Sequence, residues 1–377
     1  MIENKCRVCY QDFFEDSLLH YKNMPKSAQF FPDEDELMTE KGMDLDVCQC
    51  SGCGLVQLTN SPVFYYKEVI RAASVSKEMR DFRLKQFKQW IKKYELQGKK
   101  VIEIGCGAGE YISMMPDNVR AFGLEQGKDS VKQCVEEGFI VEEGFVENEM
   151  QKLNHAPFDA FYMLNFLEHL PDPNSTLKGI CHNLADDAIG LVEVPNFDMI
   201  LRNNLFSEFI SDHLFYFTQE TFISTLNRNG FEVIECNEIW HDYSISAVVK
   251  KRKKTDLSSF HQTQQKLTKD IEDYIGTFPE NSVAIWGAGH QALAIMSLTG
   301  LKGKIKYVVD SAPFKQNKFT PATHILIVSP DEIKETPVKA VIVMAGSYSD
   351  EVVSIIRSTY NKKIKIVSLG ENGFEIC

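Results

Sequence analysis

A short apolar run that ends in a glycine-rich turn constrains the fold of this chain more than any other feature. The run 101–104 leads directly into Gly105-Cys-Gly107-Ala-Gly109, and a stretch long enough for a helix follows. Glycines at a strand-to-helix turn let the backbone approach a ligand at the N-terminus of the helix. The pattern predicts a parallel α/β domain with a ligand site at this turn.

The same alternation of apolar runs and helix-sized stretches continues along most of the chain. A helix that begins after Ser76, its N-cap, precedes the first run. Strands are expected at 101–104, 121–124, 158–164 and 189–194. A second strand-glycine-helix pattern begins at Val283, with further strands expected at 305–310, 324–328, 341–344 and 364–369. The chain is therefore expected to contain two α/β domains.

Cysteines cluster at the N-terminal end. Cys6 and Cys9 form one C-x2-C pair, and Cys50 and Cys53 form another. Four thiolates in this arrangement make a closed tetrahedral zinc site, which folds a short segment and leaves no coordination position for catalysis. Cys48 competes with Cys50 for the third position, and free buried thiols are the alternative to a metal site. A structural zinc ion is the expectation.

Changes in composition along the chain suggest its division into parts. A zinc-binding module is expected at 1–62, the first α/β domain at 63–250, and the second at 281–377. The segment 251–280 is interpreted as a partly helical linker, since a run of basic residues and a glutamine-rich stretch interrupt the strand pattern there. The basic run is typical of a solvated charge cluster.

Composition narrows the class of protein. A hydrophobic content of 44% and a charged content of 25% are those of a globular protein. The net charge of -12 disfavours binding along a nucleic acid and favours small-molecule partners. No apolar run is long enough for a membrane helix, and the first residues lack an apolar signal core. We therefore expect a cytoplasmic protein without a membrane partner.

The glycine turn resembles that of class I S-adenosylmethionine-dependent methyltransferases. Glu103 stands before the first glycine, and Glu125 ends the next expected strand. In that family the glycine loop faces the amino-acid end of the cofactor, and the acid holds its ribose. Gly144-Phe145-Val146 is similar to the adenine-side segment, and 158–173 to the fourth-strand segment. The resemblance implies that S-adenosylmethionine contacts Glu103, Gly105, Gly107, Gly109, Glu125, Phe145 and Asn165.

The order of the three parts is similar to that of the nucleotide-sugar C-methyltransferases. Members of this family methylate carbon 3 of a 4-keto sugar carried on a nucleoside diphosphate. The resemblance implies a central Rossmann-like class I methyltransferase domain, an N-terminal zinc module and a smaller Rossmann-like C-terminal α/β domain. It also implies a nucleotide-linked sugar as the acceptor and zinc and S-adenosylmethionine as the bound groups.

The same resemblance suggests catalytic residues. A carbon nucleophile requires removal of the proton beside the ketone, and histidine suits that task. His213 stands where the family has its proposed base, and Asp212 replaces the family's glutamate. His169 and Asn165 match positions that face the sugar. Either Tyr65 or Tyr66 matches a tyrosine near the same cleft.

Departures from the family keep alternatives open. Ile210 and Ser211 replace a tyrosine and a histidine, and 345–348 replaces a Trp-Asn-Tyr segment. These changes surround the acceptor, so methylation of oxygen or nitrogen on another metabolite is the main alternative. A nucleic-acid methyltransferase with a zinc module is disfavoured by the negative charge.

The C-terminal domain suggests one more alternative. Its Gly287-Ala-Gly289 turn, with Asp310 about 20 residues later, satisfies a loose nicotinamide-binding pattern. The third glycine of that pattern is absent. Packing, or a phosphate of the substrate, is the expected use of the turn.

Overall fold

The computed structural model describes residues 5–29, 31–68, 75–370 and 373–377. The chain divides into two compact units, an N-terminal unit formed by 1–253 and a C-terminal unit formed by 254–377. Within the described ranges, no helix combines the length and the apolar character needed to cross a membrane.

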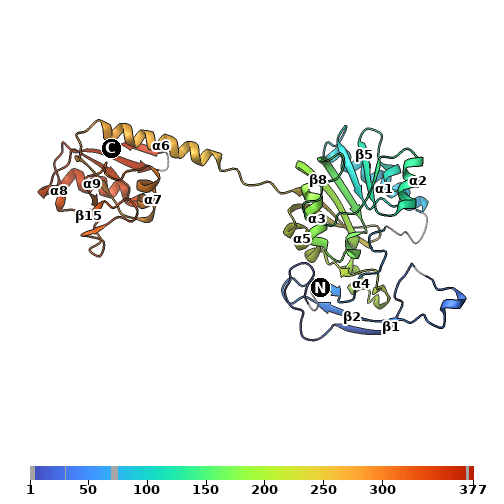
Figure 1. The fold of residues 1–377 in the computed structure, drawn as a ribbon. Coiled ribbons are helices and arrows are strands. Elements are labelled where there is room, and N and C mark those ends of the chain that lie inside the picture. Colours follow the sequence, from blue (N-terminus) through green and yellow to red (C-terminus); the bar gives the residue numbers. More distant parts are fainter. Residues whose placement is uncertain (1–4, 30, 69–74, 371–372) are drawn as a thin grey trace. The chain divides into compact units, whose positions relative to one another are not determined.

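The N-terminal unit is built on a seven-stranded sheet with the order β10-β11-β8-β7-β4-β5-β6 (Figure 1). Strands β4 to β8 are parallel, whereas β11 is antiparallel to β8 and β10 to β11. The expected strands at 101–104, 121–124, 158–164 and 189–194 are confirmed. The strands are β4 (Lys100–Ile104), β5 (Arg120–Glu125), β6 (Val141–Glu143), β7 (Phe158–Leu164), β8 (Leu184–Pro195), β10 (Phe231–Ile239) and β11 (Ser244–Lys251).

Helices cover both faces of this sheet because side chains alternate between the faces of each strand. Val101 and Tyr162 pack with α1, whereas Ile102 and Phe161 pack with α3 and α5. The N-cap expected at Ser76 is confirmed, since its hydroxyl accepts from the Met79 N–H at 3.1 Å. The helices are α1 (Lys77–Lys93), α2 (Lys128–Glu136), α3 (Pro173–His182), α4 (Phe197–Arg202) and α5 (Gln219–Arg228).

The strand order reverses between β4 and β7, which both border the glycine turn. Chain connections leave in opposite directions from such a switch point, so a crevice opens at the carboxyl ends of the strands. The residues that follow β4, β5, β7 and β8 therefore meet at one edge of the sheet. This is the Rossmann-like class I fold that the sequence predicted.

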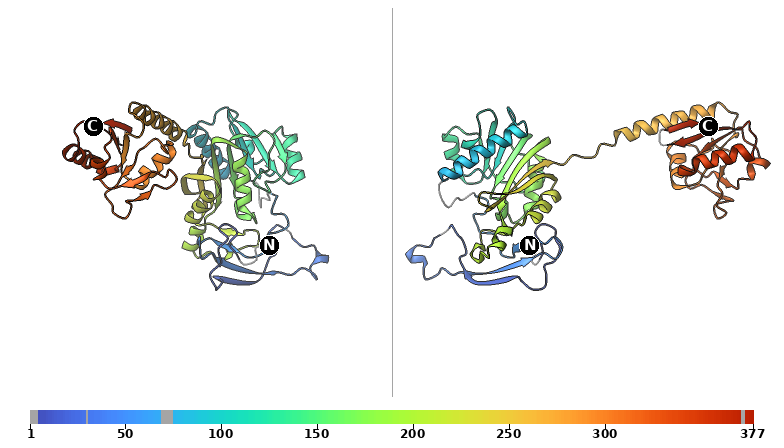
Figure 2. Two further views of the ribbon diagram at one scale, coloured as in Figure 1. Left: turned by 60° about the vertical axis from the view of Figure 1, so that its left-hand side comes forward. Right: turned by 180° about the vertical axis from the view of Figure 1, so that it is seen from behind.

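A second, four-stranded sheet with the order β1-β2-β3-β9 joins the cysteine-rich segment to the rest of the N-terminal unit. Its strands are β1 (Leu19–Met24), β2 (Met43–Gln49), β3 (Val56–Leu58) and β9 (Phe215–Tyr216). β3 pairs with β9, with Val56 opposite Tyr216 and Gln57 opposite Phe215. The sheet packs on α4, beside which β1 and β2 lie in Figures 1 and 2. Residues before β4 and after β8 thus share one sheet.

The C-terminal unit contains a seven-stranded sheet with the order β14-β15-β13-β12-β16-β17-β18. Its strands are β12 (Val283–Trp286), β13 (Val308–Val309), β14 (Lys318–Phe319), β15 (Leu326–Val328), β16 (Ala340–Val343), β17 (Lys365–Gly370) and β18 (Gly373–Ile376). Its helices are α6 (Ser258–Gly276), α7 (His290–Leu298), α8 (Glu332–Glu335) and α9 (Ser349–Thr359). The helix α6 occupies most of the segment 251–280 and packs on this unit's core through Ile271.

A buried ion pair ties α1 to the centre of the large sheet. The Arg83 guanidinium contacts the Glu193 carboxylate, and the two residues are 1% and 0% exposed. Gln86 and Ser246 also donate hydrogen bonds to Glu193. Removing one member of such a pair leaves the other charge buried and unpaired.

We expect Arg83→Met to lower the free energy of unfolding by about 3–5 kcal/mol, because Glu193 would remain buried without its cation. The measurement is urea denaturation followed by circular dichroism. Arg80→Met, an exposed position on the same helix, is the matched control. Equal urea midpoints for both variants would contradict the role given to the pair.

Candidate functional site: the glycine turn and the adjoining cavity

The glycine turn follows β4 with a backbone that other residues adopt poorly. Gly107 and Gly109 have φ values of 56° and 93°, in the left-handed region that favours glycine. A Cβ at Gly109 would lie 3.2 Å from the Cys134 Sγ, so the turn also packs closely against α2. The sequence therefore places glycine where both the conformation and the packing require it.

Glu125 ends β5 beside this turn. Its Oε2 accepts the Gly107 N–H at 2.9 Å, and its Oε1 accepts the Gly127 N–H at 2.8 Å. The residue is 1% exposed. Glu103, equally buried, accepts from the Tyr162 hydroxyl at 2.9 Å. Both carboxylates that the sequence singled out therefore lie near the glycine turn, and Glu125 holds the turn at Gly107 and the start of α2 at Gly127.

Phe145 lies in a narrow recess next to Glu125. The recess is lined by side chains from the ends of β4 and β5 and by Phe145, Phe166 and Lys67. The Lys67 ammonium lies 5.5 Å from the centre of the Phe145 ring. The recess therefore has an apolar wall with a cation at its rim.

A cavity of about 470 Å³ lies at the carboxyl ends of β7 and β8. Four residues that the sequence proposed as catalytic line it, namely Asn165, His169, Asp212 and His213. Asn165 follows β7 with φ 49°, and its Oδ1 has no hydrogen-bond partner in the described part of the chain. The structure therefore brings these residues, about 50 positions apart in sequence, to one cavity.

The two histidines lie against each other. Their ring centres are 4.8 Å apart, with the rings nearly perpendicular. The His169 Nδ1 lies 2.8 Å from the Asp212 carbonyl oxygen. A carbonyl oxygen only accepts, so Nδ1 carries the proton and Nε2 of neutral His169 is an acceptor. Burial, reinforced by His169, lowers the pKa of His213 to about 3, so His213 is a neutral imidazole at pH 7.

Asp212 connects this loop to the cysteine-rich segment. Its Oδ1 accepts from the Tyr65 hydroxyl at 2.5 Å, and its Oδ2 accepts the Ala28 N–H at 2.8 Å. Tyr65, rather than Tyr66, therefore makes this contact in the cleft, and Tyr66 packs on Phe145. The Asp212 carboxylate therefore positions the loop. Among the described residues, it makes no hydrogen bond to the His213 side chain.

Sequence reasoning missed Glu168 as a candidate site residue. It is 1% exposed, lines the cavity, and lies 3.8 Å from the His169 Nε2 through its Oε1. Its place between Leu167 and His169 was the only signal, because a single acid in a short apolar segment has no recognisable spacing. The Ala28 backbone contact was missed for a similar reason.

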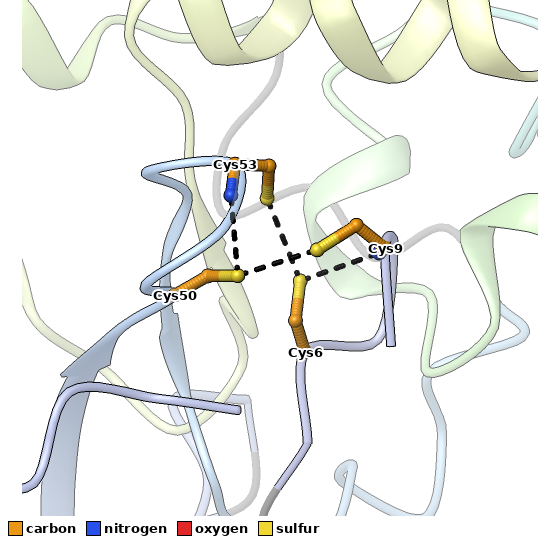
Figure 3. Close-up of side chains that lie close together, drawn as sticks. All are labelled: Cys6, Cys9, Cys50 and Cys53. Carbon is orange, nitrogen blue, oxygen red and sulfur yellow. Dashed lines mark hydrogen bonds between the residues drawn. The ribbon is translucent and has the colours of Figure 1, made fainter. Parts of the chain in front are cut away.

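The four cysteines of the two C-x2-C pairs lie together (Figure 3). The Sγ atoms of Cys6 and Cys53 are 3.7 Å apart, and those of Cys9 and Cys50 are 3.3 Å apart. Sulfur atoms at the corners of a tetrahedron with 2.3 Å zinc bonds are about 3.8 Å apart. Cys48 lies in β2 outside this group. The donor set therefore fits zinc, with Cys50 at the third position.

Backbone and side-chain donors surround these sulfurs. The N–H groups of Cys9 and Cys53 point at the Sγ of Cys6 and Cys50, at 3.5 and 3.4 Å (Figure 3). The Gln57 amide donates to the Cys6 Sγ at 3.2 Å. Such donors stabilise thiolates, the form in which cysteine binds a metal.

In the C-terminal unit the Gly287 turn is held by Asp310. The Asp310 Oδ2 accepts the Ala288 N–H at 2.9 Å and the Lys315 ammonium at 2.8 Å, and its Oδ1 accepts the Ala312 N–H at 2.9 Å. Both carboxylate oxygens are thus engaged within the unit. Backbone N–H groups engage both oxygens of Glu125 in the same way, and Asp310 has the Lys315 contact in addition.

Comparisons with known proteins agree with this geometry. A methyltransferase domain model matches residues 72–236, and a C-methyltransferase C-terminal domain model matches 247–369. The chain is 23% identical to the C-methyltransferase NovU of Streptomyces niveus, over 93% of this chain and 91% of that protein. It is 28% identical to a ubiquinone biosynthesis O-methyltransferase of Salmonella paratyphi A, over 36% of this chain and 46% of that protein.

The two domain models follow one another along the chain, and the similarity to NovU covers 93% of it. The glycine turn, Glu125 and the recess at Phe145 lie inside the first matched domain. The chain therefore carries a methyltransferase domain followed by the C-terminal domain of the C-methyltransferases, and it is an S-adenosylmethionine-dependent methyltransferase.

Proposed function

We propose that this enzyme methylates the carbon next to the ketone of a keto-deoxysugar carried on a nucleoside diphosphate. The observation that carries the proposal is His213, a neutral imidazole in a 470 Å³ cavity that lies beside the cofactor turn. The C-methyltransferase C-terminal domain supports carbon as the methylated atom. The sugar is supported by the resemblance of the three-part chain and by the polar groups of Asn165, His169 and Asp212 around the cavity.

S-adenosylmethionine, when bound at the glycine turn, supplies an electrophilic methyl group on a positively charged sulfur. Glu125 would hold its ribose, Glu103 and the three glycines its amino-acid end, and Phe145 its adenine. Asn165, which follows β7 and lines the cavity, would contact both the cofactor and the acceptor. These residues would hold the methyl donor in the alignment that such transfers require.

His213 would remove the proton from the carbon beside the ketone. A neutral imidazole can accept that proton. Burial disfavours the charged imidazolium, so His213 then releases the proton readily. Asp212 would act by position, since Tyr65 and Ala28 hold the carboxylate and its carbonyl oxygen orients His169. Asn165 and His169 would line the face of the cavity that receives the sugar.

The direct test is incubation of the enzyme with S-adenosylmethionine and a panel of nucleoside-diphosphate 4-keto sugars in deuterated water. Mass spectrometry and NMR should show a new carbon-bound methyl group and deuterium at the carbon beside the ketone. Absence of both with every keto sugar would refute carbon methylation of this class. Transfer to a hydroxyl or amine acceptor instead would establish the alternative, an O- or N-methyltransferase of the same fold.

Glu125→Ala should weaken S-adenosylmethionine binding by about 10–100-fold, because hydrogen bonds to a charged group contribute about 1.5–3 kcal/mol. The substitution also releases the Gly107 and Gly127 N–H groups. Isothermal titration calorimetry measures the affinity. Glu143→Ala, at the exposed end of the neighbouring strand β6, is the matched control. An unchanged affinity would remove Glu125 from the cofactor site.

We also propose that Cys6, Cys9, Cys50 and Cys53 hold a structural zinc ion. Four sulfur donors occupy every position of a tetrahedral ion, so the ion stabilises the segment and takes no part in methyl transfer. The distances between their sulfur atoms support this assignment.

A further inference from the structure

Glu168 is a buried acid that lines the cavity. It lies in the short helix η3 (Leu167–His169), which follows β7 and Asn165. Its backbone carbonyl accepts the Leu214 N–H at 2.8 Å, so η3 is tied to the residue that follows His213. A carboxyl oxygen of Glu168 and a ring nitrogen of each histidine, His169 and His213, lie within 4.8 Å of one another.

The Glu168 carboxyl group has little to stabilise a negative charge. Its Oε2 has no hydrogen-bond partner among the described residues, and its Oε1 lies 3.8 Å from the His169 Nε2. None of the described residues that line the cavity is a lysine or an arginine. Burial raises the pKa of Glu168 to about 8, so this group is a neutral acid with a hydrogen-bond donor at pH 7.

Two other donors that line the cavity are already used. The Tyr65 hydroxyl donates to Asp212, and the His169 Nδ1–H donates to the Asp212 carbonyl oxygen. Removing a proton beside a ketone creates an oxyanion, which needs a donor in a site that excludes water. A neutral carboxylic acid in an apolar site can serve as that donor.

We propose that Glu168 is a catalytic residue that donates a hydrogen bond to the acceptor's ketone oxygen and stabilises the enolate formed by His213. The inference rests on the proposed function. His213 takes the proton from carbon, and the electrons of the broken C–H bond form the enolate. The enolate carbon then bonds to the methyl carbon, the methyl–sulfur bond breaks with its electrons remaining on sulfur, and the ketone reforms. The proton on His213 passes to solvent.

The proposal predicts a decrease in enolate formation as the pH rises through about 8, where Glu168 loses its proton and ceases to donate. Burial lowers the pKa of His169 and of His213, and raises that of Tyr65 and that of Tyr243, the latter to about 12. These shifts move the pKa values of the four groups further from 8. The titratable groups that face the cavity with Glu168 are Tyr65, Tyr66, Glu68, Tyr111, His169, Asp212, His213 and Tyr243.

The test follows deuterium exchange beside the ketone of a keto-sugar substrate from pH 6 to pH 10, for the wild type, Glu168→Gln and Glu168→Ala. Loss of one oxyanion donor costs about 100–1,000-fold, which is the decrease expected for Glu168→Ala at pH 7. Glu168→Gln keeps an amide N–H at every pH, so it should retain partial exchange without the decrease above pH 8. The exposed Glu220→Gln is the matched control.

Three results would overturn the proposal. Wild-type exchange rates in a Glu168→Ala variant that still binds S-adenosylmethionine would remove the residue from catalysis, as would the same decrease above pH 8 in Glu168→Gln. Stimulation of wild-type exchange by added Mg²⁺ or Zn²⁺, lost in Glu168→Gln, would assign the carboxylate to a metal ion with the two histidines. A wild type that exchanges no keto sugar refutes the proposed function itself, and with it this role.

Discussion

Replacing His213 by alanine should reduce methyl transfer to the keto sugar by at least about 100-fold, and by up to 10,000-fold, while S-adenosylmethionine still binds. The expected loss is that of a general base, because no proton leaves the carbon without an acceptor beside it. Single-turnover transfer measured by mass spectrometry gives the rate, and calorimetry gives the cofactor affinity. Deuterium exchange should decrease in parallel with transfer.

His261→Ala, on the exposed surface of α6, is the matched control for this substitution. Because the pKa of His213 is lowered to about 3, its neutral form persists as the pH falls from 7 to 5. Protonation of His213 should therefore cause no decrease in rate between pH 7 and pH 5. Full exchange in His213→Ala would show that another group removes the proton.

Replacing Cys50 by serine should release the zinc ion and unfold the cysteine-rich segment, with loss of methyl transfer. Structural zinc sites of this kind contribute about 10–16 kcal/mol of binding free energy to folding. Activity should be lost because the sheet that contains β2, β3 and β9 connects the cysteine-rich segment to the loop of His213. Cys50 follows β2, β3 pairs with β9, and β9 begins two residues after His213.

The measurement combines zinc content by mass spectrometry of the metal, the melting temperature, and the rate of transfer. Cys48→Ser is the matched control, since Cys48 lies in β2 outside the four-sulfur group and should leave all three values close to wild type. If Cys50→Ser retained zinc and Cys48→Ser lost it, Cys48 would be the zinc ligand in place of Cys50. Full activity of a zinc-free chain would show that methyl transfer does not depend on the metal.

The features recognised in the sequence are those with a local physical signal. Ser76 caps α1 because its hydroxyl accepts an N–H three residues later. The β4 strand and the glycine turn were recognisable from an apolar run followed by residues that tolerate positive φ. Each signal involves neighbours in the chain, so the sequence alone was sufficient to predict the element and the cofactor turn.

The features that sequence reasoning missed depend on contacts between distant residues. Tyr65 meets Asp212, 147 positions away, and β3 pairs with β9 across a similar separation. No periodic pattern records such pairs. The protonation of Glu168 and His213 also depends on how much water the assembled cavity excludes, which is a property of the packed structure.

The sequence by itself determined the α/β class, the glycine turn with its two acids, and the two cysteine pairs, because short-range sterics and spacing encode them. Only the tertiary structure decided that Cys50 rather than Cys48 joins the sulfur group, that Tyr65 rather than Tyr66 holds Asp212, and that Glu168 is buried beside both histidines. The physical reason is that distances and burial across the cavity arise from long-range packing, which places residues from separate elements around one site.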